Sequence, residues 1–169
     1  MSKRVLVLYD SITGNTKKMA EEVAKGIEEV EGVKASIKHV DVAKPQDLLD
    51  FDGLVVGSPT HCGAVSWKLK RFFDESAHIA WNKVKGKIVG AFSSSGGLGG
   101  GNEMTLLSIL SMLMNYGYLV FGLPDYSGPG VTGHYGAVTV GKPGHLELEV
   151  CRILGRQIAR YVRAMSYRE

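Results

Sequence analysis

The stretch VLYDSITGNTKKMAEEVA, from Val7 to Ala24, joins a short apolar run, a polar loop and a segment with helical spacing. The apolar run begins earlier, as RVLVLY over residues 4–9, and its continuity is typical of a strand that is covered on both faces. Beyond the loop, apolar residues from Met19 to Val30 recur at spacings of one, three and four, which indicates one face of a helix. A buried strand that leads directly into a helix is typical of a parallel α/β fold, so this stretch predicts that class.

The same alternation of strand and helix continues along the rest of the chain. Further strands are expected at residues 33–40, 53–58, 87–94 and 118–121, and helices at residues 46–51, 65–77, 104–116 and 146–162. Five strands that alternate with helices predict a doubly wound, flavodoxin-like α/β sandwich with a five-stranded parallel sheet in the order 2-1-3-4-5. No linker interrupts the pattern, so we expect a single domain over residues 1–169.

Composition sets limits on the partners of this chain. It has 169 residues, of which 44% are hydrophobic, and a formal net charge of +3. Such a chain can bury the core of one domain, and its charge is too small for a nucleic-acid-binding arm or a polybasic membrane patch. We therefore expect no nucleic acid and no membrane among its partners.

The cysteines and the N-terminal segment carry further information. Cys62 and Cys151 form no CxxC motif and have no zinc-finger spacing to histidine, so neither a disulfide framework nor a metal site is expected. Cys62 is interpreted as a small packing residue and Cys151 as part of the core. The N-terminal apolar run ends after Tyr9, which is too short for a signal-peptide core, and a cytoplasmic location is expected.

A long uncharged segment, MTLLSILSMLMNYGYLVFGLP over residues 104–124, has the length of a membrane span. However, the sequence NYG interrupts its middle, and the acidic Glu103 and Asp125 flank it in place of Lys or Arg anchors. These features favour a buried helix, a turn and a strand. Because the helix is apolar on nearly every side, we expect a partner subunit to cover it, in a homodimer or a homotetramer.

The polar loop after the first strand is rich in hydrogen-bond donors. Its residues include Ser11, Thr13, Gly14, Asn15 and Thr16. The N-terminus of a helix presents free backbone N–H groups and the positive end of the helix dipole, and the hydroxyl and amide side chains add neutral donors. Together these groups favour the binding of a phosphate monoester. The alternative is ordinary helix capping, which needs only one such residue.

Two other phosphate-binding motifs are absent from the sequence. The pattern GxxxxGK[ST] does not occur, which argues against nucleoside triphosphate chemistry. The GxGxxG fingerprint is also missing, because the first loop has only one glycine and the later run GGLGGGNE has different spacings. A conventional dinucleotide site is therefore not expected.

Four motifs, in order along nearly the whole chain, resemble those of known FMN proteins. SITGNT at residues 11–16 resembles the FMN-phosphate loop of flavodoxins. GSPTHCGAVSWKLKRFFD at residues 57–74 resembles the flavin-contact loop of the WrbA-type NAD(P)H:quinone oxidoreductases. FSSSGGLGGGNEMT at residues 92–105 and HYGAVTV at residues 134–140 resemble later motifs of that family. The chain is thus similar to a short form of this family, without the insertion that many members carry after the second strand.

The resemblance implies FMN as the cofactor, with its phosphate held by residues 11–16. It also implies that the flavin ring lies against two later loops. The residues that it assigns to the ring are Pro59, Thr60, His61, Cys62, Gly63, Ser94, Ser95, Gly96, Gly97, Leu98 and Gly99.

Three residues are candidates for catalytic roles. By the resemblance, Trp81 matches a tryptophan that the family places beside the substrate, and Tyr116 stands where the family often has a histidine. His134, together with Tyr135, is a candidate proton donor to a quinone oxygen, and the alternative for this segment is a surface loop.

Three functions agree with these motifs. The working hypothesis is an oxidoreductase that takes electrons from the co-substrate NAD(P)H and passes them through FMN to a quinone-like acceptor. It is favoured by the positive net charge and by ring loops without an aromatic residue before Trp67, since electron-carrier flavodoxins are acidic and enclose the ring between aromatic side chains. The alternatives are a flavodoxin-type electron carrier without nicotinamide activity and a non-catalytic FMN-binding module. The cations Lys68, Lys70 and Arg71 are interpreted as a solvated helix face.

Overall fold

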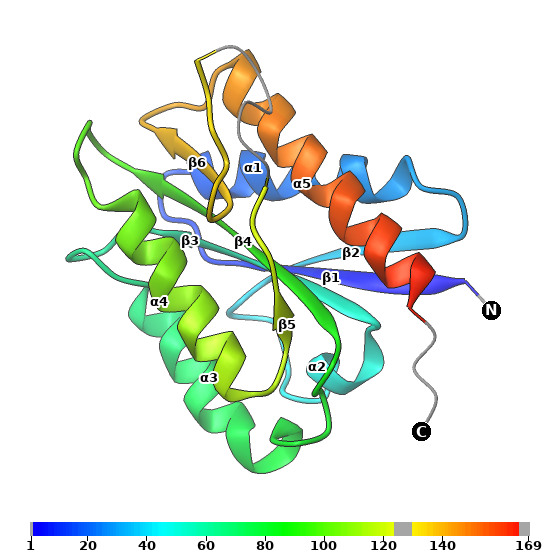
Figure 1. Ribbon diagram of the computed structural model, residues 1–169. Coiled ribbons are helices and arrows are strands. Elements are labelled where there is room, and N and C mark those ends of the chain that lie inside the picture. The colour runs from blue at the N-terminus through cyan, green and yellow to red at the C-terminus, as the bar shows by residue number, and fades with distance from the viewer. Residues whose placement is uncertain (1, 124–129, 166–169) are drawn as a thin grey trace.

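The computed structural model describes residues 2–123 and 130–165 (Figure 1). Its strands are β1 (Lys3–Tyr9), β2 (Val33–His39), β3 (Gly53–Pro59), β4 (Ile88–Ser95), β5 (Leu119–Val120) and β6 (Ala137–Val140). Its helices are α1 (Asn15–Glu28), α2 (Asp47–Asp50), α3 (Trp67–Ala80), α4 (Asn102–Asn115) and α5 (His145–Ala164). Every strand and helix expected from the sequence is present, with shifted ends.

The sheet is parallel throughout, and its order β2-β1-β3-β4-β5 confirms the predicted topology. A sixth strand was not predicted. β5 pairs with the beginning of β4, at Ile88 and Val89, whereas β6 pairs with the end of β4, from Phe92 to Ser95. Two short segments therefore share the outer position beside β4, and β6 extends the sheet toward the carboxyl ends of the strands.

Helices cover both faces of the sheet (Figure 1). Along β1, Val5 and Val7 pack under α1 and α5, while Leu6 and Leu8 pack under the opposite layer of α2, α3 and α4. All four side chains are fully buried. This burial on both faces explains why the first apolar run in the sequence is continuous instead of alternating.

Glycine allows α1 and α5 to pack closely. A Cβ atom on Gly26 would lie 2.0 Å from the carbonyl oxygen of Arg152, and one on Gly155 would lie 2.0 Å from that of Val23. Real Cβ atoms do not approach backbone this closely, so a larger residue at either position would force the helices apart. The close packing places the N-terminus of α1 firmly beside the sheet.

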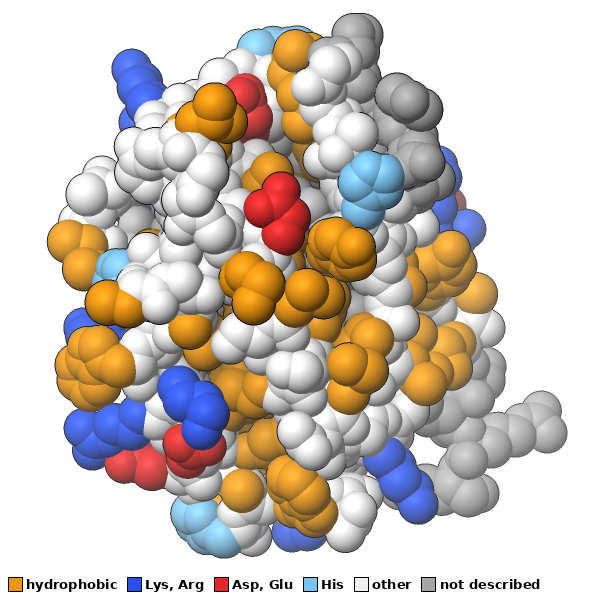
Figure 2. Space-filling view, turned by 60° about the vertical axis from the view of Figure 1, so that its left-hand side comes forward, with side chains coloured by type: hydrophobic (Ala, Val, Ile, Leu, Met, Phe, Trp, Pro, Cys, Tyr) orange, Lys and Arg blue, Asp and Glu red, His pale blue; other side chains and the backbone are white. Residues whose placement is uncertain are grey.

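The uncharged segment forms a helix, a turn and a strand, as expected. α4 ends at Asn115, a turn through Gly117 follows, and β5 then joins the sheet. Within the part of the chain that the structure describes, no helix is long and apolar enough to cross a membrane. One face of α4 is buried in the core, but Met104, Leu107 and Met114 are exposed, and apolar side chains gather on this face of the molecule (Figure 2).

Candidate functional site

Three loops meet at the carboxyl edge of the sheet. The phosphate loop (residues 10–14) follows β1, the first ring loop (residues 60–66) follows β3, and the second ring loop (residues 96–101) follows β4. These strands are neighbours, so their loops lie together at the edge where doubly wound proteins bind ligands. Direct hydrogen bonds join the three segments. The Thr16 hydroxyl lies 2.9 Å from the Ser94 hydroxyl, and the Thr60 N–H donates to the Ser94 carbonyl at 2.7 Å.

The phosphate loop has the geometry of an anion site at a helix N-terminus. Gly14 precedes α1 with a φ of +86°, a left-handed conformation that glycine adopts without strain. The Ser11 hydroxyl oxygen accepts hydrogen bonds from the N–H groups of Gly14 and Lys17, at 3.1 and 3.3 Å, which shows that these donors converge on one place. Thr13 is exposed and Asn15 is half-buried, so both side chains are available to a ligand.

Thr16 has a different place from the one expected. Its side chain is buried, and its hydroxyl is engaged with Ser94 of β4. Thr16 therefore fastens the start of α1 to the neighbouring strand. The exposed donors for a phosphate are the other predicted residues of this loop and the N–H groups of the first turn of α1.

The first ring loop begins with a tight turn. His61 and Ala64 exchange backbone hydrogen bonds at 3.1 Å in both directions, and both central residues, Cys62 and Gly63, have positive φ. This pair of left-handed residues is typical of a type I′ turn, which directs its backbone outward. The Cys62 side chain is exposed, so its interpretation as a packing residue is wrong. Cys151 is buried in the core as expected, and burial raises the pKa of its thiol.

The second ring loop presents bare backbone. Gly96 to Gly100 are exposed, and Leu98 between them is 96% exposed. A Cβ atom on Gly96, Gly97 or Gly99 would meet no other atom within 4 Å, and the same holds at Gly63 in the first ring loop. The backbone of both ring loops is therefore open to a flat ring. Together with the neutral donors of the phosphate loop, this arrangement fits FMN.

The sequence analysis missed a polar cluster between the ring loops. Asn102 begins α4, is only 5% exposed, and hydrogen-bonds to Thr60 of the first ring loop, Ser95 of β4 and Thr139 of β6. Thr105 lies one turn later, is fully buried, and donates to the Thr60 hydroxyl at 2.9 Å. The available signal was weak, because it consists of single polar residues at the start of an otherwise apolar helix.

Two candidate catalytic residues lie at the other end of the molecule. Trp81 follows the last residue of α3 and Tyr116 follows the last residue of α4, whereas the ring loops lead into the first residues of these helices. Each helix has 14 residues, which corresponds to about 21 Å. Within one chain neither residue reaches the ring loops, so their role beside a flavin stays a prediction.

Trp81 and Tyr116 instead contact each other. Their ring centroids are 5.1 Å apart, and both line a pocket of about 380 Å³ between α3 and α4. The Tyr116 hydroxyl donates to the Phe73 carbonyl. Burial and the nearby charge of Asp74 raise the pKa of Tyr116 to about 12. A phenol with this environment is a structural donor and a poor acid at neutral pH.

The third candidate, His134, lies at the outer edge of the sheet. His134 comes three residues before Ala137, the first residue of β6. Ala137 pairs with Phe92 in β4, and the second ring loop begins only after Ser95, so His134 precedes the part of the sheet edge next to that loop. His134 and Tyr135 are exposed and line a small pocket of about 50 Å³ beside Glu103. That volume is too small for a nicotinamide or a quinone. Within one chain, the structure does not bring His134 to the flavin loops.

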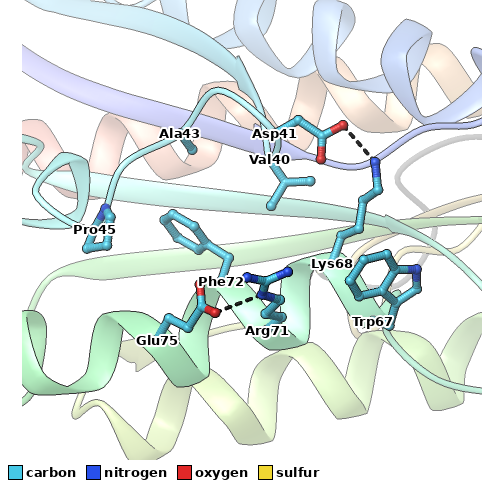
Figure 3. Close-up of a pocket in the computed structure, with 9 residues that line it drawn as sticks. All are labelled: Val40, Asp41, Ala43, Pro45, Trp67, Lys68, Arg71, Phe72 and Glu75. Atoms are coloured by element: carbon cyan, nitrogen blue, oxygen red, sulfur yellow. Dashed lines mark hydrogen bonds and ion pairs between the residues drawn. The ribbon is translucent and has the colours of Figure 1, made fainter.

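The cationic run at the start of α3 is paired with acids. Lys68 lies 2.6 Å from Asp41, and the other two cations pair with carboxylates four residues later on the same helix. This pairing supports the interpretation as a solvated helix face. The Asp41 pair lies beside a pocket of about 270 Å³ that Trp67 and Phe72 also line (Figure 3). The hydrogen bond from Lys68 lowers the pKa of Asp41, so this pair stays charged at neutral pH.

The comparisons with known proteins agree with this site. The flavodoxin family profile matches residues 7–140 of the chain. A flavodoxin from Aquifex aeolicus is 58% identical over 160 residues, which cover 94% of this chain and 86% of the relative. An NAD(P)H dehydrogenase (quinone) from Archaeoglobus fulgidus is 34% identical over 184 residues, covering 92% of this chain and 95% of the relative. A solved flavodoxin, WrbA-like protein from Agrobacterium tumefaciens superposes with a TM-score of 0.80 at 26% identity, covering 98% of this chain and 100% of that one.

The fold defines a flavodoxin-like protein, with a donor-rich loop before the first helix and exposed glycine backbone in the loop after β4. The chain belongs to the flavodoxin family, and that membership implies FMN as its cofactor.

Proposed function

We propose that this chain is an FMN-dependent electron carrier of the flavodoxin type. The observation that supports the proposal is that the three loops present donors and open backbone that fit FMN, while Trp81 and Tyr116 lie at the far ends of α3 and α4 from these loops within one chain. An electron carrier needs a held flavin and an accessible ring edge, and it needs no acid or base beside the ring. The similarity to a flavodoxin from Aquifex aeolicus at 58% identity supports the same class.

Different loops would bind different parts of FMN. Ser11, Thr13, Asn15 and the N–H groups at the start of α1 would bind the phosphate. The backbone of the ring loops would lie against the flavin ring and leave one edge open to solvent. When bound, FMN would supply the redox chemistry, and the loops would hold and orient it.

A second function, NAD(P)H:quinone oxidoreduction, is favoured by one specific observation. Gly96 to Gly100 are exposed, and the second ring loop itself contains no aromatic residue. A bare ring face admits a nicotinamide at the distance of about 3–3.5 Å that hydride transfer requires. The 34% identity to an NAD(P)H dehydrogenase (quinone) from Archaeoglobus fulgidus gives this function additional support.

One experiment separates the two functions. The protein is loaded with FMN, mixed without oxygen with NADH or NADPH, and followed by its visible flavin absorbance, after which benzoquinone is added. An electron carrier keeps its colour with both nicotinamides and loses it only with a chemical reductant such as dithionite. Rapid bleaching by a nicotinamide and recovery with the quinone would establish the oxidoreductase and overturn the carrier. A protein that does not retain FMN would overturn both.

We also propose that a second copy of the chain covers the outer face of α4. This face exposes Met104, Leu107 and Met114 beside the groove that α3 and α4 form. α4 carries a single charged residue, Glu103, at its start. In a two-fold symmetric dimer the same surface faces itself, so an uncharged face avoids the repulsion of like charges. Sedimentation velocity tests this proposal, and a monomer at micromolar concentration would contradict it.

A further inference from the structure

We propose that Asn102 is a positioning residue that holds the two ring loops at a set distance from each other for the flavin. The proposal rests on the assignment of the ring loops to FMN. It concerns a residue that neither contacts the phosphate loop nor is exposed to solvent, since Asn102 is 5% exposed. Its role comes from the hydrogen bonds of a single amide side chain.

All hydrogen-bonding positions of the Asn102 side chain are used. Its Oδ1 accepts from the hydroxyls of Ser93 and Thr60, at 3.2 and 3.3 Å. Its Nδ2 donates to the hydroxyl of Ser95 at 3.0 Å and to the carbonyl of Thr139 at 3.1 Å. An amide offers two acceptor lone pairs and two N–H donors, so every one has a partner. The side chain thereby joins β4, β6 and the first ring loop.

These bonds continue into both ring loops. On one side, Ser95 links Asn102 to the second ring loop, because its hydroxyl accepts from Asn102 and donates to the Gly97 carbonyl at 3.1 Å. On the other side, Thr60 leads directly into the tight turn of the first ring loop. The loops also touch, since a Cβ atom on Gly101 would lie 3.6 Å from the Cα atom of Gly63. Asn102 therefore sets the position of two backbone segments that would face the same flat ring.

Helix capping does not explain this arrangement. The residue before α4 is Gly101, and no side chain caps the helix. The Asn102 amide instead points to strand and loop residues that lie up to 42 positions away in sequence. A buried amide with four partners, two of them 37 and 42 positions away in sequence, holds loops in place only if its donors and its acceptors are both present. Aspartate has the same shape but lacks the donors to Ser95 and Thr139.

The test measures binding of three ligands that share parts of FMN. FMN and riboflavin binding are measured by quenching of flavin fluorescence, and inorganic phosphate binding by the rise in melting temperature. In the Asn102→Ala variant we expect FMN and riboflavin affinity to fall by the same factor, about tenfold, because both ligands carry the flavin ring that the two ring loops would face. Phosphate binding should be unchanged, since Ser11 and the start of α1 make no hydrogen bond to Asn102.

The matched control is Asn115→Ala, at the other end of the same helix. Asn115 is exposed, and its amide donates only to the Ser111 carbonyl at 3.2 Å. This variant should bind all three ligands as the wild type does. The visible circular dichroism of bound FMN adds a second readout, because altered loop positions change the asymmetric surroundings of the ring. That spectrum should change in Asn102→Ala and stay constant in the control.

Three results would overturn the proposal. The first is a riboflavin affinity of Asn102→Ala within about twofold of the wild type. The second is a loss of phosphate binding equal to the loss of riboflavin binding. The third is the failure of both Asn102→Ala and Asn102→Asp to fold. The second and third would mean that Asn102 serves the whole domain and not the ring loops. Asn102→Asp otherwise should resemble the alanine variant, because it keeps the acceptors and loses the donors. The same titrations with the wild-type protein test FMN binding itself, so a failure of the proposed FMN site can be told apart from a failure of the positioning role of Asn102.

Discussion

The left-handed glycine of the phosphate loop allows a test with a closely matched control. Gly14 has a φ of +86° and Gly32 a φ of +82°, and a Cβ atom at either position would meet no other atom within 4 Å. Alanine at each site therefore pays the same backbone strain, about 1 kcal/mol, without a clash. For a chain of this size that cost corresponds to a fall in melting temperature of about 2–4 °C. Gly14→Ala and Gly32→Ala should thus be destabilised equally.

FMN affinity should distinguish the two variants. The Gly14 N–H donates toward the place where Ser11 and Lys17 converge, whereas Gly32 lies between α1 and β2, away from the loops. Alanine keeps the backbone N–H at position 14, but its strained backbone relaxes from the left-handed conformation, and restoring that conformation around the phosphate costs up to about 1 kcal/mol, which predicts up to about fivefold weaker FMN binding. Fluorescence titration measures this difference. Equal FMN affinity in the two variants would refute the phosphate loop as the anion site.

Further predictions concern the fold and the two ends of the molecule. Gly155→Ala should lower the free energy of unfolding by about 3 kcal/mol in urea titration, because its Cβ would meet the Val23 carbonyl. A loss of stability equal to that of Gly32→Ala would count against this packing. Burial raises the pKa of Tyr116 to about 12, so its contribution to stability should be lost as the pH rises from about 10 through about 12. In chemical denaturation, Tyr116→Phe should therefore lose less free energy of unfolding than the wild type over this pH interval. Tyr116→Phe should also leave FMN affinity unchanged, and weaker binding would contradict its distance from the site. Leu107→Glu should convert an oligomer into monomers in sedimentation velocity, and an unaltered sedimentation coefficient would exclude this face as the interface.

Local patterns were enough to predict most of the fold. The apolar run before Asp10, the helical spacing after Thr16 and their repetition along the chain led to the correct strand order, because parallel crossovers permit few topologies. The phosphate loop was found in the same way, since its donors are adjacent in sequence and directly precede α1. Strand β6 was missed because its four residues lie in a glycine-rich segment and are too few to show a period.

The limits of sequence-based prediction at the site have a common physical cause. Trp81 and Tyr116 were assigned by matching positions in a family, but a helix of about 21 Å separates each of them from the loops. Asn102 was overlooked because its hydrogen-bond partners come from three other segments, and no local sequence pattern around it predicts these contacts.

The sequence by itself determined the elements, their order and the donor-rich character of the first loop, because each of these depends on residues close together in the chain. Tertiary structure alone decided which distant polar groups meet between the ring loops and which candidate residues lie beyond reach of the flavin. Those relations depend on helix length, strand register and close backbone packing, which combine contributions from the whole chain.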